Sequence, residues 1–142
     1  SSVSRLGLRD WITLVSLLVL PALAVVNLPF EWWISGTYLI CLSGLTWFHY
    51  ASDKKRAAAR AWRISESRLH LLDLLGGWPG GFLAQKHFRH KTAKPGFQFV
   101  FWFTVTLHQI ISLDYLGDWA LWNALLDWIE PFLKQSVGIA LR

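Results

Sequence analysis

The 142-residue chain contains no methionine and a single cysteine, Cys41. One cysteine cannot form an intramolecular disulfide, so no disulfide framework holds this fold together. Charged residues make up only 16% of the chain, against about 25% in a typical soluble domain. No Gly-Lys-Ser/Thr loop is present, which excludes a P-loop nucleotide site. Because position 1 is serine, we expect that the natural chain is longer or has lost its initiator.

Three long segments of the sequence contain no charged residue. Residues 11–30, 32–50 and 97–113 contain no Lys, Arg, Asp or Glu. About 20 helical residues cross a hydrocarbon core of about 30 Å. Ten tryptophans and nine phenylalanines also suit a bilayer, because aromatic rings gather at its two interfaces. The sequence therefore predicts an all-α integral membrane protein with three transmembrane helices.

The first stretch has a second interpretation. Arg5 and Arg9 precede it, and Ala22-Leu23-Ala24 resembles a cleavage site, so a signal peptide fits the same pattern. A second uncharged stretch follows at once, which favours a membrane span that is kinked at Pro21.

The second and third stretches carry features that predict helix packing. In the second, Gly36, Thr37, Cys41 and Gly44 are small and lie roughly one turn apart, which would let a neighbouring helix approach closely. The helix is predicted to continue into residues 53–62, which are rich in Ala and Arg. In the third, His108-Gln109 predicts a hydrogen bond between helices.

Positive charge is concentrated between the second and third stretches. Residues 53–94 hold ten Lys/Arg and three acids, whereas the rest of the chain holds four Lys/Arg and six acids. Cytoplasmic loops of membrane proteins carry an excess of Lys and Arg. We therefore expect a multi-pass membrane protein with a cytoplasmic N-terminus and with residues 114–118 outside.

The basic region 53–96 also contains a predicted hairpin. Ser65 can cap a helix that carries Glu66 in its first turn, and the glycine-rich segment 76–81 ends that helix. The helix is too short to span a bilayer, and basic residues flank 69–84 on both sides. We therefore predict a re-entrant or interfacial hairpin rather than a span. After the third span, residues 119–133 predict an amphipathic helix in the outer interface, interrupted by Pro131.

The hairpin and its basic flanks are the candidate binding site. Freed backbone N–H groups at the bend could cradle an anion, with cations on both sides. The predicted ligand-binding residues are Arg63, Arg89, His90, Lys91, Lys94, Gly77 and Gly80, and the predicted supporting residues are Asp53, Lys54 and Glu66. A simpler interpretation is that the charge only fixes topology and contacts anionic headgroups.

Glu66 should stay ionised among so many cations, because nearby positive charge favours the charged form of a carboxyl group. We expect it to pair with Arg63 or Arg89. Such a pair would tie the start of the capped helix to the basic segment beyond the bend.

An enzymatic interpretation uses a different set of residues. Glu66, His70 and Asp73 lie on one helical face, and His90 lies beyond the bend. No Glu-x-x-His or His-Glu-x-x-His pair occurs, so the sequence predicts no metal site and no cofactor. These four residues would act on a lipid-linked substrate.

Several short motifs resemble one bacterial membrane family. They are Asp53-Lys54, Arg63-Ile64-x-Glu66-x-x-Leu69, Leu75-Gly76-Gly77-Trp78-Pro79-Gly80, Gln85 and Arg89-His90-Lys91-Thr92-x-Lys94-x-x-Phe97. From about Trp47 to Phe103 they resemble "domain of unknown function 1294". Ser65 stands where that family usually has proline. The resemblance implies a place in the bacterial cytoplasmic (inner) membrane, a cytoplasmic N-terminus and, in many members, a preceding cold-shock domain. These 142 residues do not include such a domain, and a start at Ser1 would suit a trimmed fusion. The resemblance implies no activity.

These patterns favour a binding module for a phosphate-bearing ligand or an anionic lipid headgroup. The alternatives are a membrane-embedded enzyme and a plain anchor for a nucleic-acid-binding domain or partner.

Overall fold

The computed structural model describes residues 5–140, and this part of the chain is helical with no strand. The all-α prediction is therefore confirmed. The elements are α1 (Leu8–Val26), α2 (Trp32–Ala58), α3 (Glu66–Leu72), a π-helical turn η1 (Asp73–Gly77), α4 (Trp78–Phe88), α5 (Pro95–Leu116) and α6 (Ala120–Ala140).

Two helices, α1 and α5, are long and apolar enough to cross a membrane, where the sequence predicted three. The helix that does not qualify is α2. It is long enough at 27 residues, but Ser, Thr, Gly, Trp, Tyr and His dilute its aliphatic residues, and its last turns are basic. The prediction that this helix continues past residue 50 is confirmed, although it ends at Ala58.

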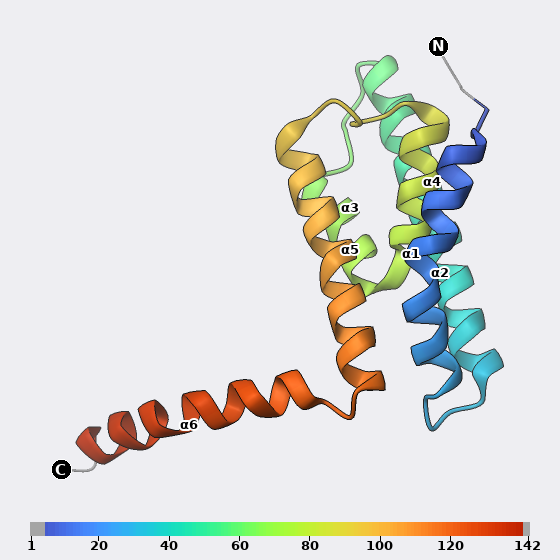
Figure 1. The fold of residues 1–142 in the computed structure, drawn as a ribbon. Coiled ribbons are helices and arrows are strands. Elements are labelled where there is room, and N and C mark those ends of the chain that lie inside the picture. The colour runs from blue at the N-terminus through green and yellow to red at the C-terminus, as the bar shows by residue number, and fades with distance from the viewer. Residues whose placement is uncertain (1–4, 141–142) are drawn as a thin grey trace.

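The capped helix and the helix after it form a bent hairpin. Ser65 accepts a hydrogen bond from the backbone N–H of Arg68 at 3.3 Å, as the cap prediction required. The chain turns at Gly76, whose φ of +118° is a conformation that favours glycine. From that bend α4 runs back toward the end of the bundle where α2 ends and α5 begins (Figure 1). Residues 69–84 are therefore not one straight helix.

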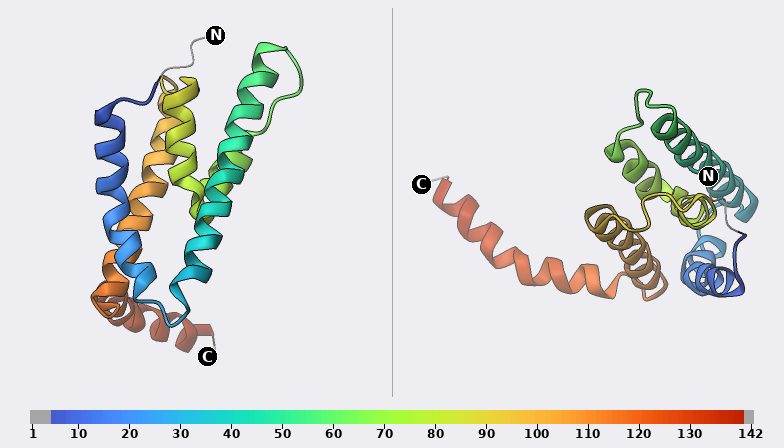
Figure 2. Two further views of the ribbon diagram at one scale, coloured as in Figure 1. Left: turned by 90° about the vertical axis from the view of Figure 1, so that its right-hand side faces the viewer. Right: turned by 90° about the horizontal axis from the view of Figure 1, so that it is seen from above.

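The hairpin packs against α2 through its glycines. A Cβ on Gly77 would lie 1.9 Å from Thr46 Oγ1, and a Cβ on Gly80 would lie 2.0 Å from the carbonyl oxygen of Ser43. Figure 2 shows α2 and α4 side by side, in agreement with their extensive contact. The close approach predicted at Gly36 and Gly44 is wrong, because a Cβ on either would meet open space. The small residues that matter lie on the hairpin rather than on α2.

Two apolar clusters hold the hairpin between the long helices. One joins α1, α4 and α5 and contains Leu14, Trp78, Phe82, Phe101 and Val105. The other joins α2, α3, α4 and α5 and contains Tyr50, Ile64, Leu69, Ala84 and Phe97.

Polar contacts add to the packing of α1 on α5. Gln109 Nε2 donates to the carbonyl oxygen of Leu17 at 2.6 Å, so the interhelical hydrogen bond predicted for this pair of residues is confirmed at Gln109. Tyr115 Oη donates to the carbonyl oxygen of Asn27 at 2.7 Å, which joins the end of α5 to the α1–α2 turn.

The last helix, α6, extends away from the bundle (Figure 1). It begins close to the predicted start but continues to Ala140. The predicted interruption at Pro131 is wrong, because the helix runs through this proline. A proline inside a helix removes one backbone hydrogen bond and strains the preceding turn, and the exposed position of α6 leaves room for that adjustment.

Candidate functional site

A buried carboxylate, Asp53, organises the basic end of the bundle. It lies beyond the uncharged part of α2 and is completely buried. Arg63 donates to it through Nη2 at 2.8 Å and Nε at 3.3 Å, in the forked geometry that suits a carboxylate. The backbone N–H of Ile64 donates at 3.1 Å, and His90 Nε2 lies 2.7 Å from Oδ2. Asp53 therefore joins α2 to the segment before α3 and to the turn after α4.

These donors keep Asp53 ionised. Burial alone would raise the pKa of the carboxyl group, but hydrogen bonds from Arg63 and His90 and the charge of Lys91 outweigh it and lower the pKa to about 2. Burial lowers the pKa of His90 below its ordinary value, although the bond to Asp53 opposes this. Burial thus favours the neutral form of His90, which donates to Asp53 when its proton is on Nε2.

A second carboxylate, Glu66, is tied to the turn after α4. Lys91 Nζ donates to Glu66 Oε1 at 3.0 Å, and Lys94 Nζ donates to the same oxygen. These two bonds lower the pKa of Glu66 to about 2, and the bond from Lys94 makes the larger contribution. Lys91 Nζ also lies 3.5 Å from Asp53 and so bridges the two carboxylates. The expected pairing of Glu66 with Arg63 or Arg89 is wrong, because the lysines lie closer.

The turn after α4 has an unusual backbone. Arg89 and Lys91 both have a positive φ, 48° and 61°, which non-glycine residues seldom adopt. The left-handed residue Arg89 ends α4, and Lys54 Nζ donates to the carbonyl oxygen of Phe88. This conformation directs His90 and Lys91 at Asp53. The Arg89 side chain is exposed and forms no hydrogen bond or ion pair with the residues the structure describes.

The structure does not bring the predicted glycines to these cations. Gly77 and Gly80 lie at the start of α4, beside the bend, whereas Arg89 follows the end of this helix. Both face α2 so closely that a Cβ would not fit. Their place in the structure is a packing contact. The predicted anion cradle of glycine N–H groups between basic flanks is therefore not assembled, whereas Asp53, Lys54, Arg63, Glu66, His90, Lys91 and Lys94 do come together.

A polar chain inside the hairpin was not predicted. Tyr50 Oη donates to Asp73 Oδ2 at 2.6 Å, and Gln85 Nε2 lies 3.4 Å from Tyr50 Oη. Gln98 Nε2 donates to Gln85 Oε1 at 2.7 Å and to the carbonyl oxygen of Lys91 at 3.1 Å. The available signal was the presence of two glutamines in otherwise apolar helices. These hydrogen bonds connect Asp73, at the buried end of α3, with Lys91 in the turn after α4.

The four residues of the enzymatic interpretation do not converge. Glu66 binds lysines and His90 binds Asp53. The ring of His70 stacks on Phe97 with centroids 4.3 Å apart, while Asp73 accepts from Tyr50. Between residues 5 and 140, no group of three or more His, Cys, Asp or Glu side chains is placed to hold a metal ion.

Comparisons with known proteins cover this same region. The family model described as "Protein of unknown function (DUF1294)" matches residues 43–97. "Uncharacterized protein YsdA" of Bacillus subtilis (strain 168) is 35% identical over 66 residues, which cover 46% of this chain and 74% of that protein. No solved structure matches the chain. The family match runs from the Ser43 contact with the hairpin to Phe97, and it includes every residue of the Asp53 and Glu66 interactions.

Proposed function

This chain belongs to the DUF1294 family of proteins of unknown function, so we propose its function from its own geometry: it is a multi-pass membrane protein that binds an anionic, phosphate-bearing group at its basic end.

The exposure of the apolar helices supports membrane insertion. In the most apolar stretch of 18 residues in each helix, only 11% of the residues of α1 and 22% of those of α5 are buried within the protein. The core helix of a soluble protein would bury most of its apolar side chains. Exposed aliphatic and aromatic side chains on this scale would cause aggregation in water, whereas hydrocarbon solvates them.

The course of the chain supports three crossings. In Figure 1, α1 and α5 both start at the end of the bundle that bears the N-terminus and run to the opposite end. If both cross the bilayer, α2 must cross in the return direction to reach the start of α3. Thr46 and Tyr50 of α2 are buried, so much of the polarity that lowers its hydropathy faces protein rather than lipid.

The distribution of charged residues supports a cytoplasmic position for the basic end of the bundle. The ten basic residues of 53–94 and Arg5 and Arg9 belong to segments at one end of the bundle, while Glu31 and Asp118 belong to turns at the other (Figure 1). The positive-inside rule places the basic end in the cytoplasm. The hairpin then enters the membrane from the cytoplasmic side and returns to it.

One observation carries the binding proposal: the cations around Asp53 and Glu66 outnumber the carboxylates. Lys54, Arg63, Lys91 and Lys94 contribute four positive charges to this end of the bundle, against the two negative charges of Asp53 and Glu66. Arg89, in the same turn as His90 and Lys91, adds an exposed cation. The side chains of Arg63 and Lys94 remain 48% and 57% exposed although both are held by carboxylates. Cations that are fixed in place but still exposed suit a phosphate group, which Arg can bind in a forked geometry and Lys as a point charge.

Native mass spectrometry tests this proposal on the full chain. We expect it to retain phosphatidylglycerol in preference to phosphatidylcholine, because each basic residue near an anionic headgroup contributes about 1 kcal/mol. Arg89→Gln removes a cation without breaking an internal bond, and it should weaken retention roughly five-fold. Lys134→Gln is the matched control, because Lys134 lies on α6 and pairs with Glu130.

Competition with inorganic phosphate distinguishes a site that recognises a free phosphate group from one that recognises a lipid headgroup. If inorganic phosphate displaces phosphatidylglycerol from the wild type but not the residual lipid from Arg89→Gln, the site recognises the phosphate itself. If phosphate has no effect while the lipid preference persists, the site needs the headgroup at a membrane surface. Equal retention of both lipids, unchanged by Arg89→Gln, would contradict the proposal.

A further inference from the structure

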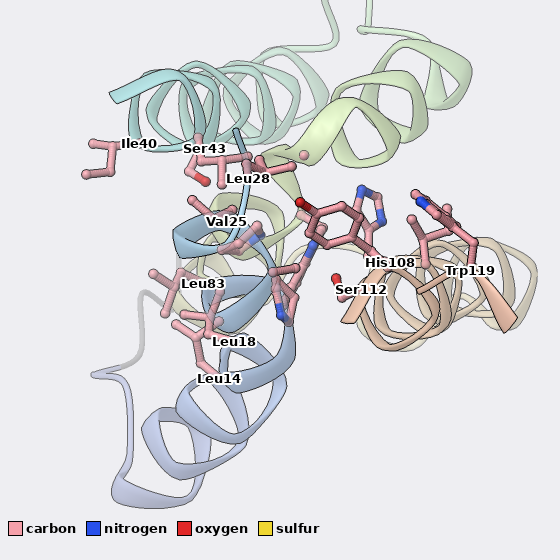
Figure 3. A pocket seen from close by; sticks show the side chains of 18 residues that line it. Leu14, Leu18, Val25, Leu28, Ile40, Ser43, Leu83, His108, Ser112 and Trp119 are labelled. Atoms are coloured by element: carbon pink, nitrogen blue, oxygen red, sulfur yellow. The ribbon is translucent and has the colours of Figure 1, made fainter. Parts of the chain in front are cut away.

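The hairpin fills only part of the length of the bundle. The chain turns back at Gly76, while α1 and α5 continue toward the α1–α2 turn and the start of α6 (Figure 1). Beyond the bend, the space between the long helices is a cavity of about 580 Å³. Leu18 of α1, Ser43 of α2 and Ser112 of α5 line its walls (Figure 3), and Gly76 and Pro79 of the hairpin close it on one side.

The lining of this cavity contains no charged residue. Two of its larger polar groups already bond within the bundle. His108 Nδ1 lies 2.8 Å from the carbonyl oxygen of Thr104, and Tyr115 Oη donates to Asn27. An uncharged apolar lining is complementary to hydrocarbon, and an empty apolar cavity of this size forfeits the dispersion contacts that an occupant would supply.

The margins of the cavity show where an occupant would enter. Ile40 lines it and is 74% exposed, and Trp119, at the α5–α6 junction, lines it and is 41% exposed. The cavity is therefore open to its surroundings. Two of its walls, α1 and α5, are the helices able to cross a membrane, so at this depth those surroundings are lipid chains.

We propose that this cavity binds one acyl chain of a zwitterionic or uncharged membrane lipid, with the headgroup at the Tyr115–Trp119 end. Tyrosine and tryptophan suit the interface between headgroups and chains. Asp118 is exposed beside Trp119 and would repel an anionic headgroup at this end, whereas the buried carboxylate of Asp114 accepts from the backbone N–H groups of Leu121 and Trp122. The inference rests on membrane insertion as proposed above but concerns a second site, away from the cations.

Photo-crosslinking tests the proposal on the full chain in lipid nanodiscs. The probe is phosphatidylcholine with a diazirine near the end of one acyl chain. Because the headgroup lies at the Tyr115–Trp119 end, we expect adducts at the hairpin end of the cavity, in residues 14–18, at Trp78 or Pro79 and at His108. Ala24→Phe fills the cavity, since Ala24 lines it and is 9% exposed, and it should abolish these adducts. Ala22→Phe makes the same change at an exposed position of α1 and should leave them unchanged.

A second variant and a second lipid complete the test. Ser112→Phe fills the cavity from α5 and replaces Ala24→Phe if that variant does not fold. Phosphatidylglycerol carrying the same diazirine chain should give fewer cavity adducts. The inference would be overturned by adducts spread evenly over the outer faces of the helices. It would also be overturned by cavity adducts that persist in both Ala24→Phe and Ser112→Phe. Resistance of the protein to carbonate extraction from membranes is scored separately, so loss of the cavity adducts alone leaves membrane insertion intact.

Discussion

A fully buried carboxylate is tolerated at Asp53 because donors from two segments, the stretch before α3 and the turn after α4, surround it. Moving a charge from water into the protein interior costs several kcal/mol unless partners replace its hydration. Arg63, the Ile64 N–H and His90 do so directly, and Lys91 adds a charge at 3.5 Å. Lys91 is therefore the residue on which the two carboxylates depend in common.

The two lysines on Glu66 should differ in what they contribute. The Lys91 side chain is 6% exposed and that of Lys94 is 57% exposed. Loss of one partner from a buried ion pair costs about 3–5 kcal/mol, whereas exposed pairs contribute about 0.2–1 kcal/mol. We expect Lys91→Gln to lower the free energy of unfolding in detergent far more than Lys94→Gln, as measured by thermal unfolding.

Double variants test the pairing itself. Glu66→Gln combined with Lys91→Gln should be clearly non-additive, because the two changes remove one shared interaction. Glu66→Gln combined with Arg89→Gln should be additive, since Arg89 has no bond to Glu66. Additivity in both combinations would show that the pairing with Lys91 does not exist in solution.

At the scale of the element, the hairpin depends on glycines for packing. A glycine in a helix normally costs about 0.5–1 kcal/mol relative to alanine. Gly77→Ala and Gly80→Ala should nevertheless destabilise the protein by more than about 1 kcal/mol, because Cβ atoms would collide with Thr46 and with the Ser43 carbonyl group. Gly36→Ala is the matched control in α2 and should be neutral or stabilising, since nothing lies within 4 Å of its Cβ position.

The nature of each collision allows a finer test of the hairpin packing. Gly77→Ala meets chiefly the Thr46 side chain, so Thr46→Ala should restore part of the lost thermal stability. Gly80→Ala meets the Ser43 backbone, so truncating a side chain should not restore it. Equal stability of Gly36→Ala, Gly77→Ala and Gly80→Ala would contradict the packing of the hairpin on α2.

The elements show which features a sequence can predict. The Ser65 cap and the break at Gly76 depend on residues within one turn and were predictable from local chemistry. The partners of Glu66 come from 25 and 28 positions away and depend on the left-handed turn at Arg89 and Lys91, which no residue type there favours. Gly77 and Gly80 were recognised as special, but a glycine needed for a ligand and one needed for a helix contact look alike in sequence.

At the scale of the whole molecule, the two ends of the bundle should face opposite sides of the membrane. In a Cys41→Ser background, Leu116→Cys should react with a membrane-impermeant maleimide in intact cells. Ala58→Cys should react only after the membrane is permeabilised, because it lies at the basic end. Labelling of position 58 in intact cells would contradict the orientation, and labelling of both after permeabilisation is the control for access.

The sideways course of α6 has a mechanical consequence. If α6 lies among the headgroups of the outer leaflet, as its sequence predicts, this helix of 21 residues occupies area in that leaflet, while the re-entrant hairpin occupies area in the cytoplasmic one. An amphipathic helix inserted at this shallow depth takes up lateral area in one leaflet only, and such insertion is sensitive to curvature. In that position we expect α6 to favour membranes whose outer surface is convex, in opposition to the area that the hairpin occupies in the cytoplasmic leaflet.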